Sequence, residues 1–126
     1  MSRIDHIALF HFPSCGLIYY NNGNYTQALS DYNKEIEINP HIAEVYNNRG
    51  NVYSSQGKLQ QAILDFNKAI EINPDYADAH YNRGLIYYHL KEYDKAWADV
   101  HSAERSGASV DAEFISELKK ASGMGQ

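Results

Sequence analysis

The stretch that decides the fold occurs twice in the chain. Residues 33–40 read NKEIEINP and residues 67–74 read NKAIEINP, so seven of eight letters agree when residue 33 is aligned with residue 67. The same shift relates glycines, tyrosines, alanines and aspartates in three copies each: Gly16, Gly50 and Gly84; Tyr19, Tyr53 and Tyr87; Ala28, Ala62 and Ala96; Asp31, Asp65 and Asp99. A fixed period of 34 residues indicates stacked structural repeats and not one globule around a central core.

Each copy has the pattern of two amphipathic helices joined by a tight turn. In the second copy, Tyr46, Gly50 and Tyr53 are spaced i, i+4 and i+7, which places them on one helical face. A second face of small and apolar residues follows at similar spacing: Ala62, Phe66, Ala69 and Ile70. Gly57 lies between the two faces, and Pro74 ends the second helix. We therefore expect helices near residues 13–22, 25–38, 43–56, 59–72, 77–90 and 93–105.

Residues 9–42, 43–76 and 77–110 resemble three successive units of the tetratricopeptide repeat (TPR) family, whose motif is a helix-turn-helix. Arg49 and Arg83 stand where the family usually has leucine. The third unit departs further, with His80 at the tryptophan position, Val100 at the aromatic position and Ala108 at the proline position. The resemblance implies an all-α fold. It would be an α-solenoid whose helix pairs form a right-handed superhelix with a concave face.

The two ends of the repeat array differ in character. Residues 1–8 are an apolar leader, and residues 111–126 are a capping helix and tail. Val110, Phe114 and Leu118 share one helical face, so we expect a helix near 111–121 that covers the last repeat. The apolar residues of 4–12 either fold back over the open face or mark an interface. That interface would join a second copy of the chain, or further repeats of a longer array.

Composition excludes several classes of function. A net charge of −5 with four arginines and no basic run is unlike a nucleic-acid-binding protein. Cys15 is the only cysteine, so the chain has neither an internal disulfide framework nor a Cys-rich zinc site. No stretch approaches the roughly eighteen apolar residues of a membrane span. We expect a cytoplasmic protein without nucleic-acid or membrane partners.

The histidines and carboxylates form no motif for catalysis or metal binding. His80 and His89 share one expected helix, but a spacing of nine residues does not place both on one metal ion. The chain has no His-Glu-x-x-His motif, Gly-rich phosphate loop or nucleophile elbow. We therefore expect a protein that is not an enzyme and uses no cofactor or metal. His80 is expected to pack against its partner helix, and the recurring aspartates are expected to have a structural or outer-face role.

In the TPR family, the first helix of each unit lines the concave face, and the resemblance assigns that face to particular residues here. Those we expect to contact a partner are asparagines, tyrosines and their neighbours: Tyr20, Asn21, Asn47, Asn48, Asn51, Tyr81, Asn82, Leu85, Tyr88 and His89. An asparagine amide both donates and accepts, which suits the backbone of an extended peptide. A tyrosine supplies contact area with a polar tip. Alternatively, these asparagines are merely solvated on an exposed helix.

The charge at these positions restricts the partner. Some family members bind acidic chaperone tails through a clamp of lysine, arginine and asparagine at five positions. In this chain the five positions are held by Pro13, Leu17, Asn48, Asp78 and Asn82, and only Asn48 matches the clamp. Glu44 and Asp78 would repel an acidic tail. The expected function is therefore protein–protein interaction with a neutral to mildly basic extended segment or helix, and self-association through residues 4–12 is the alternative.

Overall fold

A computed structural model describes residues 24–123 of the 126-residue chain. This part contains six α-helices and no strand: α3 (Tyr25–Ile38), α4 (Ala43–Ser55), α5 (Leu59–Ile72), α6 (Ala77–His89), α7 (Tyr93–Arg105) and α8 (Ala112–Ser122). The predicted all-α class is confirmed. Each of these helices begins and ends within one residue of its expected position. The leader, the apolar residues 4–12 and the helix expected near 13–22 lie outside the described residues.

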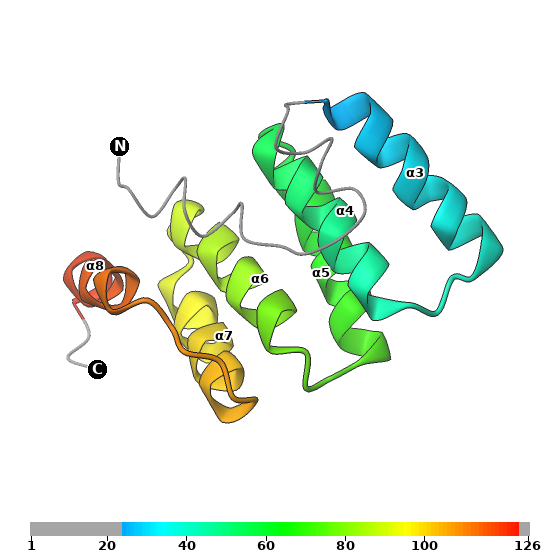
Figure 1. The fold of residues 1–126 in the computed structure, drawn as a ribbon. Helices are drawn as coiled ribbons and strands as arrows, with labels where there is room; N and C mark the ends of the chain where they lie inside the picture. Colours follow the sequence, from blue (N-terminus) through cyan, green and yellow to red (C-terminus); the bar gives the residue numbers. More distant parts are fainter. Residues whose placement is uncertain (1–23, 124–126) are drawn as a thin grey trace.

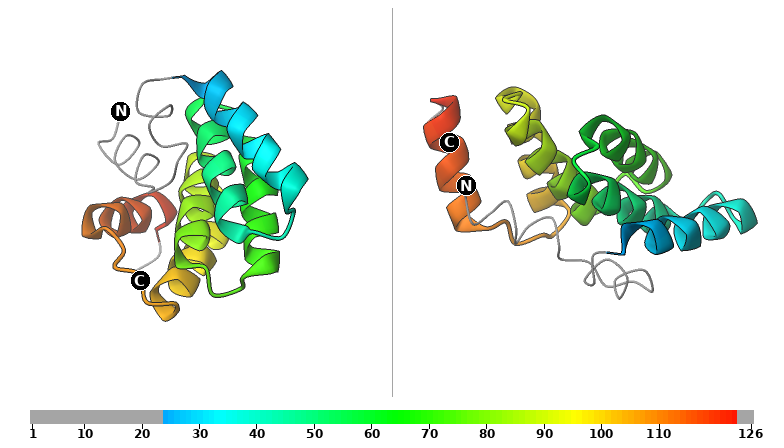
Figure 2. Two further views of the ribbon diagram at one scale, coloured as in Figure 1. Left: turned by 45° about the vertical axis from the view of Figure 1, so that its right-hand side comes forward. Right: turned by 90° about the horizontal axis from the view of Figure 1, so that it is seen from above.

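The helices form pairs that follow one another along the molecule. α4 packs on α5 and α6 packs on α7, and these two pairs are neighbours through α5 and α6 (Figures 1 and 2). α3 lies at one end of the row, against α4, and α8 lies at the other end, against α7. This arrangement is the expected α-solenoid. It brings α4 and α6, the first helices of two successive units, side by side (Figure 1).

The turn between the two helices of a unit is built in the same way in successive repeats. Gly57 has a positive φ of 79°, and the next amide, Lys58, donates to the carbonyl of Tyr53 at 2.9 Å. Lys91, at the equivalent position of the next unit, has a φ of 62°, and the Glu92 amide donates to the Tyr87 carbonyl at 2.8 Å. This left-handed cap satisfies carbonyls that a helix end leaves open. A residue with a Cβ atom is strained in that conformation, so Lys91 destabilises the turn slightly in comparison with the glycine at position 57.

Small residues allow the two helices of a unit to approach closely. A Cβ atom on Gly50 would lie 2.7 Å from Cε1 of Phe66, a ring that is fully buried. A Cβ atom on Gly84 would lie 3.1 Å from the Cβ atom of Asp99. Ala62 and Ala96, on the facing helices, are also fully buried. Gly50 and Gly84 are therefore packing residues.

The helix α8 closes the C-terminal end of the array. Its residues Phe114 and Leu118 are 0% exposed and join a core cluster with Leu85, Trp97 and Val100. The Asp111 side chain caps the helix by accepting a hydrogen bond from the Glu113 amide at 2.9 Å. This cap burial replaces the contact that a further repeat would have made.

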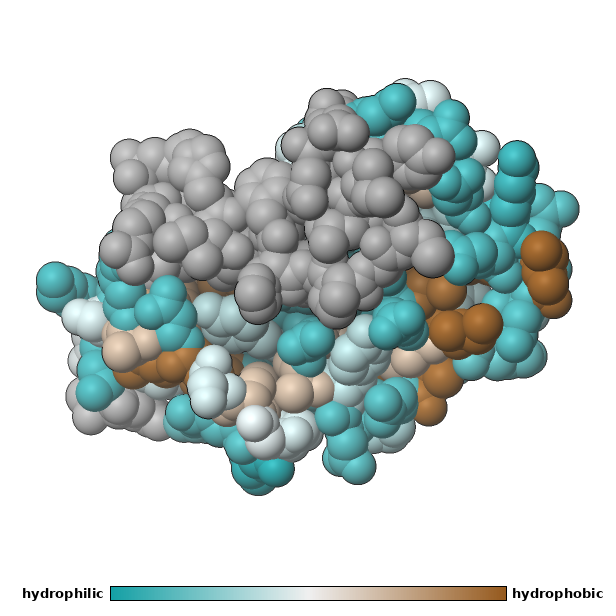
Figure 3. All heavy atoms as spheres, viewed as in Figure 1, coloured by the Kyte–Doolittle hydropathy of each residue, from teal (hydrophilic) through white to brown (hydrophobic). Residues whose placement is uncertain are grey.

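Most of the drawn surface is hydrophilic, with apolar patches among it (Figure 3). Three large apolar residues are exposed among those that the structure describes: Ile38 at 85%, Ile42 at 40% and Leu64 at 67%. Ile38 and Ile42 flank the turn between α3 and α4. None of the described helices is long and apolar enough to cross a membrane.

Candidate binding face

The candidate site lies where α4 and α6 run side by side (Figure 1). On α4, Glu44 is followed at helical spacing by three asparagines: Asn47, Asn48 and Asn51. On α6, Asp78 is followed at the corresponding positions by Tyr81, Asn82 and Leu85. The repeat therefore places two equivalent residue sets on adjacent parallel helices. Tyr20 and Asn21, which were also expected at this site, lie outside the described residues.

Two of the expected contact residues bond to one another. Nδ2 of Asn82 donates to Oδ1 of Asn47 at 3.1 Å, and both side chains are 1% exposed. Asn47 also lies near the hydroxyl of Tyr76, the residue that precedes α6. The alternative that Asn47 is merely solvated on an exposed helix is wrong, because its amide is buried and joins α4 to α6. Asn82 has the same bridging role through its Nδ2 atom. The Oδ1 atom of Asn82 has no hydrogen-bond partner within residues 24–123.

Asn51 differs from these two asparagines. Its side chain is 2% exposed, yet neither its Nδ2 nor its Oδ1 atom has a hydrogen-bond partner within residues 24–123. Asn48, one turn earlier, is 5% exposed. A buried amide without a partner is costly, so such a group requires an explanation. Asn51 is therefore the strongest candidate for a residue whose hydrogen bonds are completed by a ligand.

Aromatic residues close the face at the α8 end. The ring of Phe114 makes edge contacts with Tyr81 and Tyr88, at centroid distances of 5.8 Å and 5.5 Å. Leu85 is 1% exposed and belongs to the core cluster beside them, so it packs inside the array and does not line an open groove. His89 is exposed at the end of α6, with its ring 5.7 Å from that of Tyr88.

Burial and negative charge act on two tyrosine hydroxyls of this face. Burial, followed by the charges of Glu44 and Asp78, raises the pKa of Tyr76 to about 12. Burial, followed by the charge of Asp111, raises the pKa of Tyr81 to about 12. Both phenols therefore remain neutral hydrogen-bonding groups at any physiological pH.

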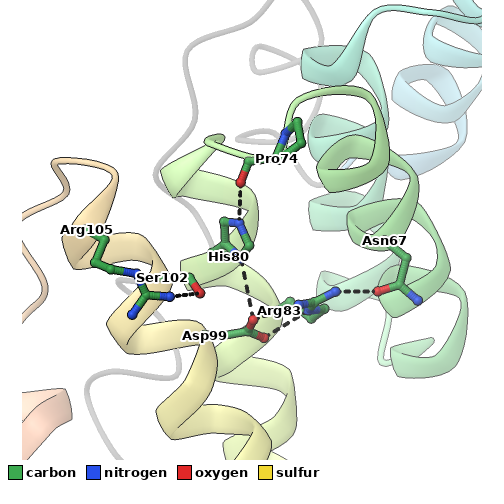
Figure 4. Close-up of polar contacts among 7 residues, drawn as sticks. All are labelled: Asn67, Pro74, His80, Arg83, Asp99, Ser102 and Arg105. Atoms are coloured by element: carbon green, nitrogen blue, oxygen red, sulfur yellow. Dashed lines mark hydrogen bonds and ion pairs between the residues drawn. The ribbon is translucent and has the colours of Figure 1, made fainter.

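The structure reveals a repeated polar clasp that the sequence analysis did not identify. Arg83 donates from Nε and Nη2 to the two carboxylate oxygens of Asp99, at 2.9 Å and 2.7 Å, and from Nη1 to Oδ1 of Asn67 at 2.8 Å (Figure 4). The same three bonds recur one repeat earlier, among equivalent residues: Arg49, Asp65 and Asn33. The arginine thus connects both helices of its own unit to the second helix of the preceding unit.

The clasp pairs both arginines with aspartates of the scaffold. Hydrogen bonding to Asp65 is the largest cause that raises the pKa of Arg49. Burial alone would lower the pKa of Arg83, but the hydrogen bonds and charge of Asp99 outweigh it and raise that pKa. Asp65 and Asp99 are 5% and 3% exposed, so of the two roles expected of the recurring aspartates, structural or outer-face, these two have the structural one. The spacing of 16 residues on either side of each arginine was the available signal.

His80 and Tyr46 make equivalent contacts at the same repeat position. The hydroxyl of Tyr46 donates to the carbonyl of Pro40 at 2.9 Å, and Nε2 of His80 lies 2.8 Å from the carbonyl of Pro74 (Figure 4). Nδ1 of His80 faces Asp99 at 3.5 Å. His80 is 8% exposed and held between two elements of the scaffold, so it packs as expected.

These features define a helical-repeat protein in which one face of the first helices carries unsatisfied polar groups. The family model described as TPR repeat matches residues 16–57 and 50–91, which together span more than half of the chain. The chain belongs to the tetratricopeptide repeat family. No curated protein matches its sequence.

Solved structures of TPR domains resemble the whole fold. The first TPR domain of Spaghetti (RPAP3), bound to the HSP90 peptide SRMEEVD, is 27% identical with a TM-score of 0.77, and the match covers 86% of this chain and 85% of that one. The TPR2B domain of yeast Sti1 in a pHsp70 complex is 25% identical with a TM-score of 0.74, over 97% of this chain and 98% of that one. The Arabidopsis OM64 TPR domain is 27% identical with a TM-score of 0.76, over 83% and 88%.

Proposed function

We propose that this chain is a non-enzymatic interaction module that binds a peptide segment of a partner protein along the α4–α6 face. The observation that carries the proposal is the amide of Asn51, which is 2% exposed and has no partner within residues 24–123. An amide can donate to and accept from the backbone of an extended peptide. A bound peptide would therefore complete the hydrogen bonds that the scaffold leaves open.

The related structures support a peptide as the ligand. The Spaghetti domain is bound to an HSP90 peptide, and the yeast Sti1 domain forms a complex with pHsp70. In the part of this chain that the structure describes, no group of three or more His, Cys, Asp or Glu residues could hold a metal ion. The complexes of these related domains support binding as the function.

The charges of the face favour a neutral or mildly basic segment. The HSP90 peptide SRMEEVD bound by the Spaghetti domain carries three acidic residues. Here Glu44 and Asp78 are exposed near the start of α4 and α6. The only arginines of these helices, Arg49 and Arg83, are both engaged by aspartates. An acidic segment would thus meet two carboxylates and no available cation on α4 or α6.

The test begins with peptides selected from a displayed random 12-residue library on the wild-type chain. We expect Asn51→Ala to weaken a selected peptide about tenfold, the equivalent of about 1.4 kcal/mol. The same substitution should leave the urea midpoint unchanged or higher, since it removes a buried group without a partner. Fluorescence polarisation gives the affinity and circular dichroism gives the stability.

Asn67→Ala is the matched control. Asn67 lies on α5, away from the α4–α6 face, and the substitution removes only its hydrogen bond to Arg83. It should therefore lower stability slightly and leave peptide affinity unchanged. The proposal is wrong if the library yields no binding peptide, or if selected peptides bind the Asn51→Ala chain as tightly as the wild type.

A further inference from the structure

Two carboxylates flank the hydrogen bond that joins α4 to α6. Glu44 lies three residues before Asn47, and Asp78 lies four residues before Asn82, so each is one helical turn from the bonded amides. The two helices contact one another, and the pairing of Asn47 with Asn82 sets their positions. Glu44 and Asp78 therefore lie at the same end of the α4–α6 face.

Tyr76, the residue before α6, lies near both carboxylates. After burial, the charges of Glu44 and Asp78 are the next causes that raise the pKa of its hydroxyl. The Tyr76 side chain is partly buried, whereas both carboxylates belong to exposed residues. Neither carboxylate forms an ion pair with another residue of the described part of the chain.

An acidic residue in the first turn of a helix also stabilises the helix dipole, and that effect alone needs no ligand. The unpaired Oδ1 atom of Asn82 gives an independent reason for one. Asn82 is 1% exposed, its Nδ2 atom is used by Asn47, and its Oδ1 atom has no donor within residues 24–123. A buried acceptor in an amide pair one helical turn from two exposed carboxylates suits a ligand group that donates hydrogen bonds and carries positive charge.

We propose that Glu44, Asp78 and the amide of Asn82 form a subsite for a lysine or arginine side chain of the bound peptide. The subsite rests on the proposed peptide-binding function and specifies one side chain of the ligand. The ammonium or guanidinium group donates to acceptors that the scaffold leaves unused.

The experiment compares three chains on the same random 12-residue library. These are the wild type, the subsite variant Glu44→Gln/Asp78→Asn, and the control variant Glu37→Gln/Asp94→Asn. The control also removes one glutamate and one aspartate charge, but from exposed positions on α3 and α7. We expect lysine and arginine to be enriched several-fold at one position of the peptides selected by the wild type and the control. That enrichment should disappear with the subsite variant.

A direct affinity measurement completes the test. One selected peptide and its Lys→norleucine (or Arg→norleucine) analogue are titrated into the wild type and the subsite variant. The analogue should bind the wild type about tenfold more weakly and bind the subsite variant as the parent peptide does. Peptides selected without basic enrichment, or enrichment that survives in the subsite variant, would overturn the subsite while leaving peptide binding intact. A wild-type chain that selects no peptide would overturn both proposals.

Discussion

Arg83 on α6 donates two hydrogen bonds, of 2.9 Å and 2.7 Å, to the nearly buried carboxylate of Asp99 on α7. The side chain of Asp99 is 4% exposed and that of Arg83 is 21% exposed. Arg49 and Asp65 repeat this pair in the preceding unit. The two pairs join the first helix of a unit to the second by a charged contact, beside the apolar contact that the glycines permit.

Removal of the arginine should be strongly destabilising. Arg83→Ala leaves Asp99 buried without its main partner, and we expect a loss of about 3 kcal/mol in the free energy of unfolding. The double substitution Arg83→Met/Asp99→Leu removes both charges and should recover most of that loss. Urea unfolding followed by circular dichroism measures both. Arg105→Ala, which removes an exposed arginine, should change stability by no more than about 0.5 kcal/mol. Equal effects of Arg83→Ala and Arg105→Ala would contradict the clasp.

Lys91 should be replaceable by glycine with a gain in stability. It has a φ of 62° at the position where the preceding unit has Gly57. Lys91→Gly removes the strain of a left-handed side-chain residue, about 1–2 kcal/mol, and loses about half of that through the greater freedom of the unfolded chain. We expect a net gain of about 0.5–1 kcal/mol by thermal or urea unfolding. The reciprocal Gly57→Ala should destabilise, and a gain from that substitution would contradict this account.

The fluorescence of Trp97 should show when α8 separates from the rest of the array. Trp97 is 4% exposed, contacts the Phe114 cluster and donates from Nε1 to Oγ of Ser122 at 3.1 Å. Phe114→Ala should cost about 3–5 kcal/mol, because a fully buried aromatic side chain is lost. Emission of Trp97 should shift to longer wavelength before the rest of the chain unfolds in urea. The exposed substitution Lys119→Ala should leave both the emission and the midpoint unchanged.

High pH should destabilise the fold through two tyrosines. The pKa values of Tyr76 and Tyr81 are raised to about 12, whereas an unfolded phenol titrates near 10. The folded state therefore binds these protons more tightly. The resulting stability is fully present below about pH 10 and is lost as the pH rises from about 10 to about 12. Absorbance of the tyrosinate ion, recorded on folded chain, should show a late fraction that decreases in Tyr76→Phe and Tyr81→Phe. Titration of every tyrosine near 10 would exclude this effect.

The candidate site was predictable in part from the sequence. The resemblance to the TPR family assigned Asn47, Asn48, Asn51 and Asn82 to the concave face of two first helices. Periodicity does not show which amides bond to each other. The Asn47–Asn82 bond joins residues 35 positions apart, so it depends on how α4 and α6 approach. The distinction between bridging asparagines and the unpartnered Asn51 therefore required the structure.

The sequence by itself determined the helices, their order and the solenoid, because each is encoded by contacts within one repeat unit or between neighbouring units. Only the tertiary structure decided what the polar residues do. Arg49 and Arg83 pair with aspartates, and Leu85 packs in the core. Asn51 has no hydrogen-bond partner among the described residues. The physical reason is that hydrogen bonds and ion pairs are decided by distances of about 3 Å between atoms, and a spacing pattern fixes helix faces without fixing such distances.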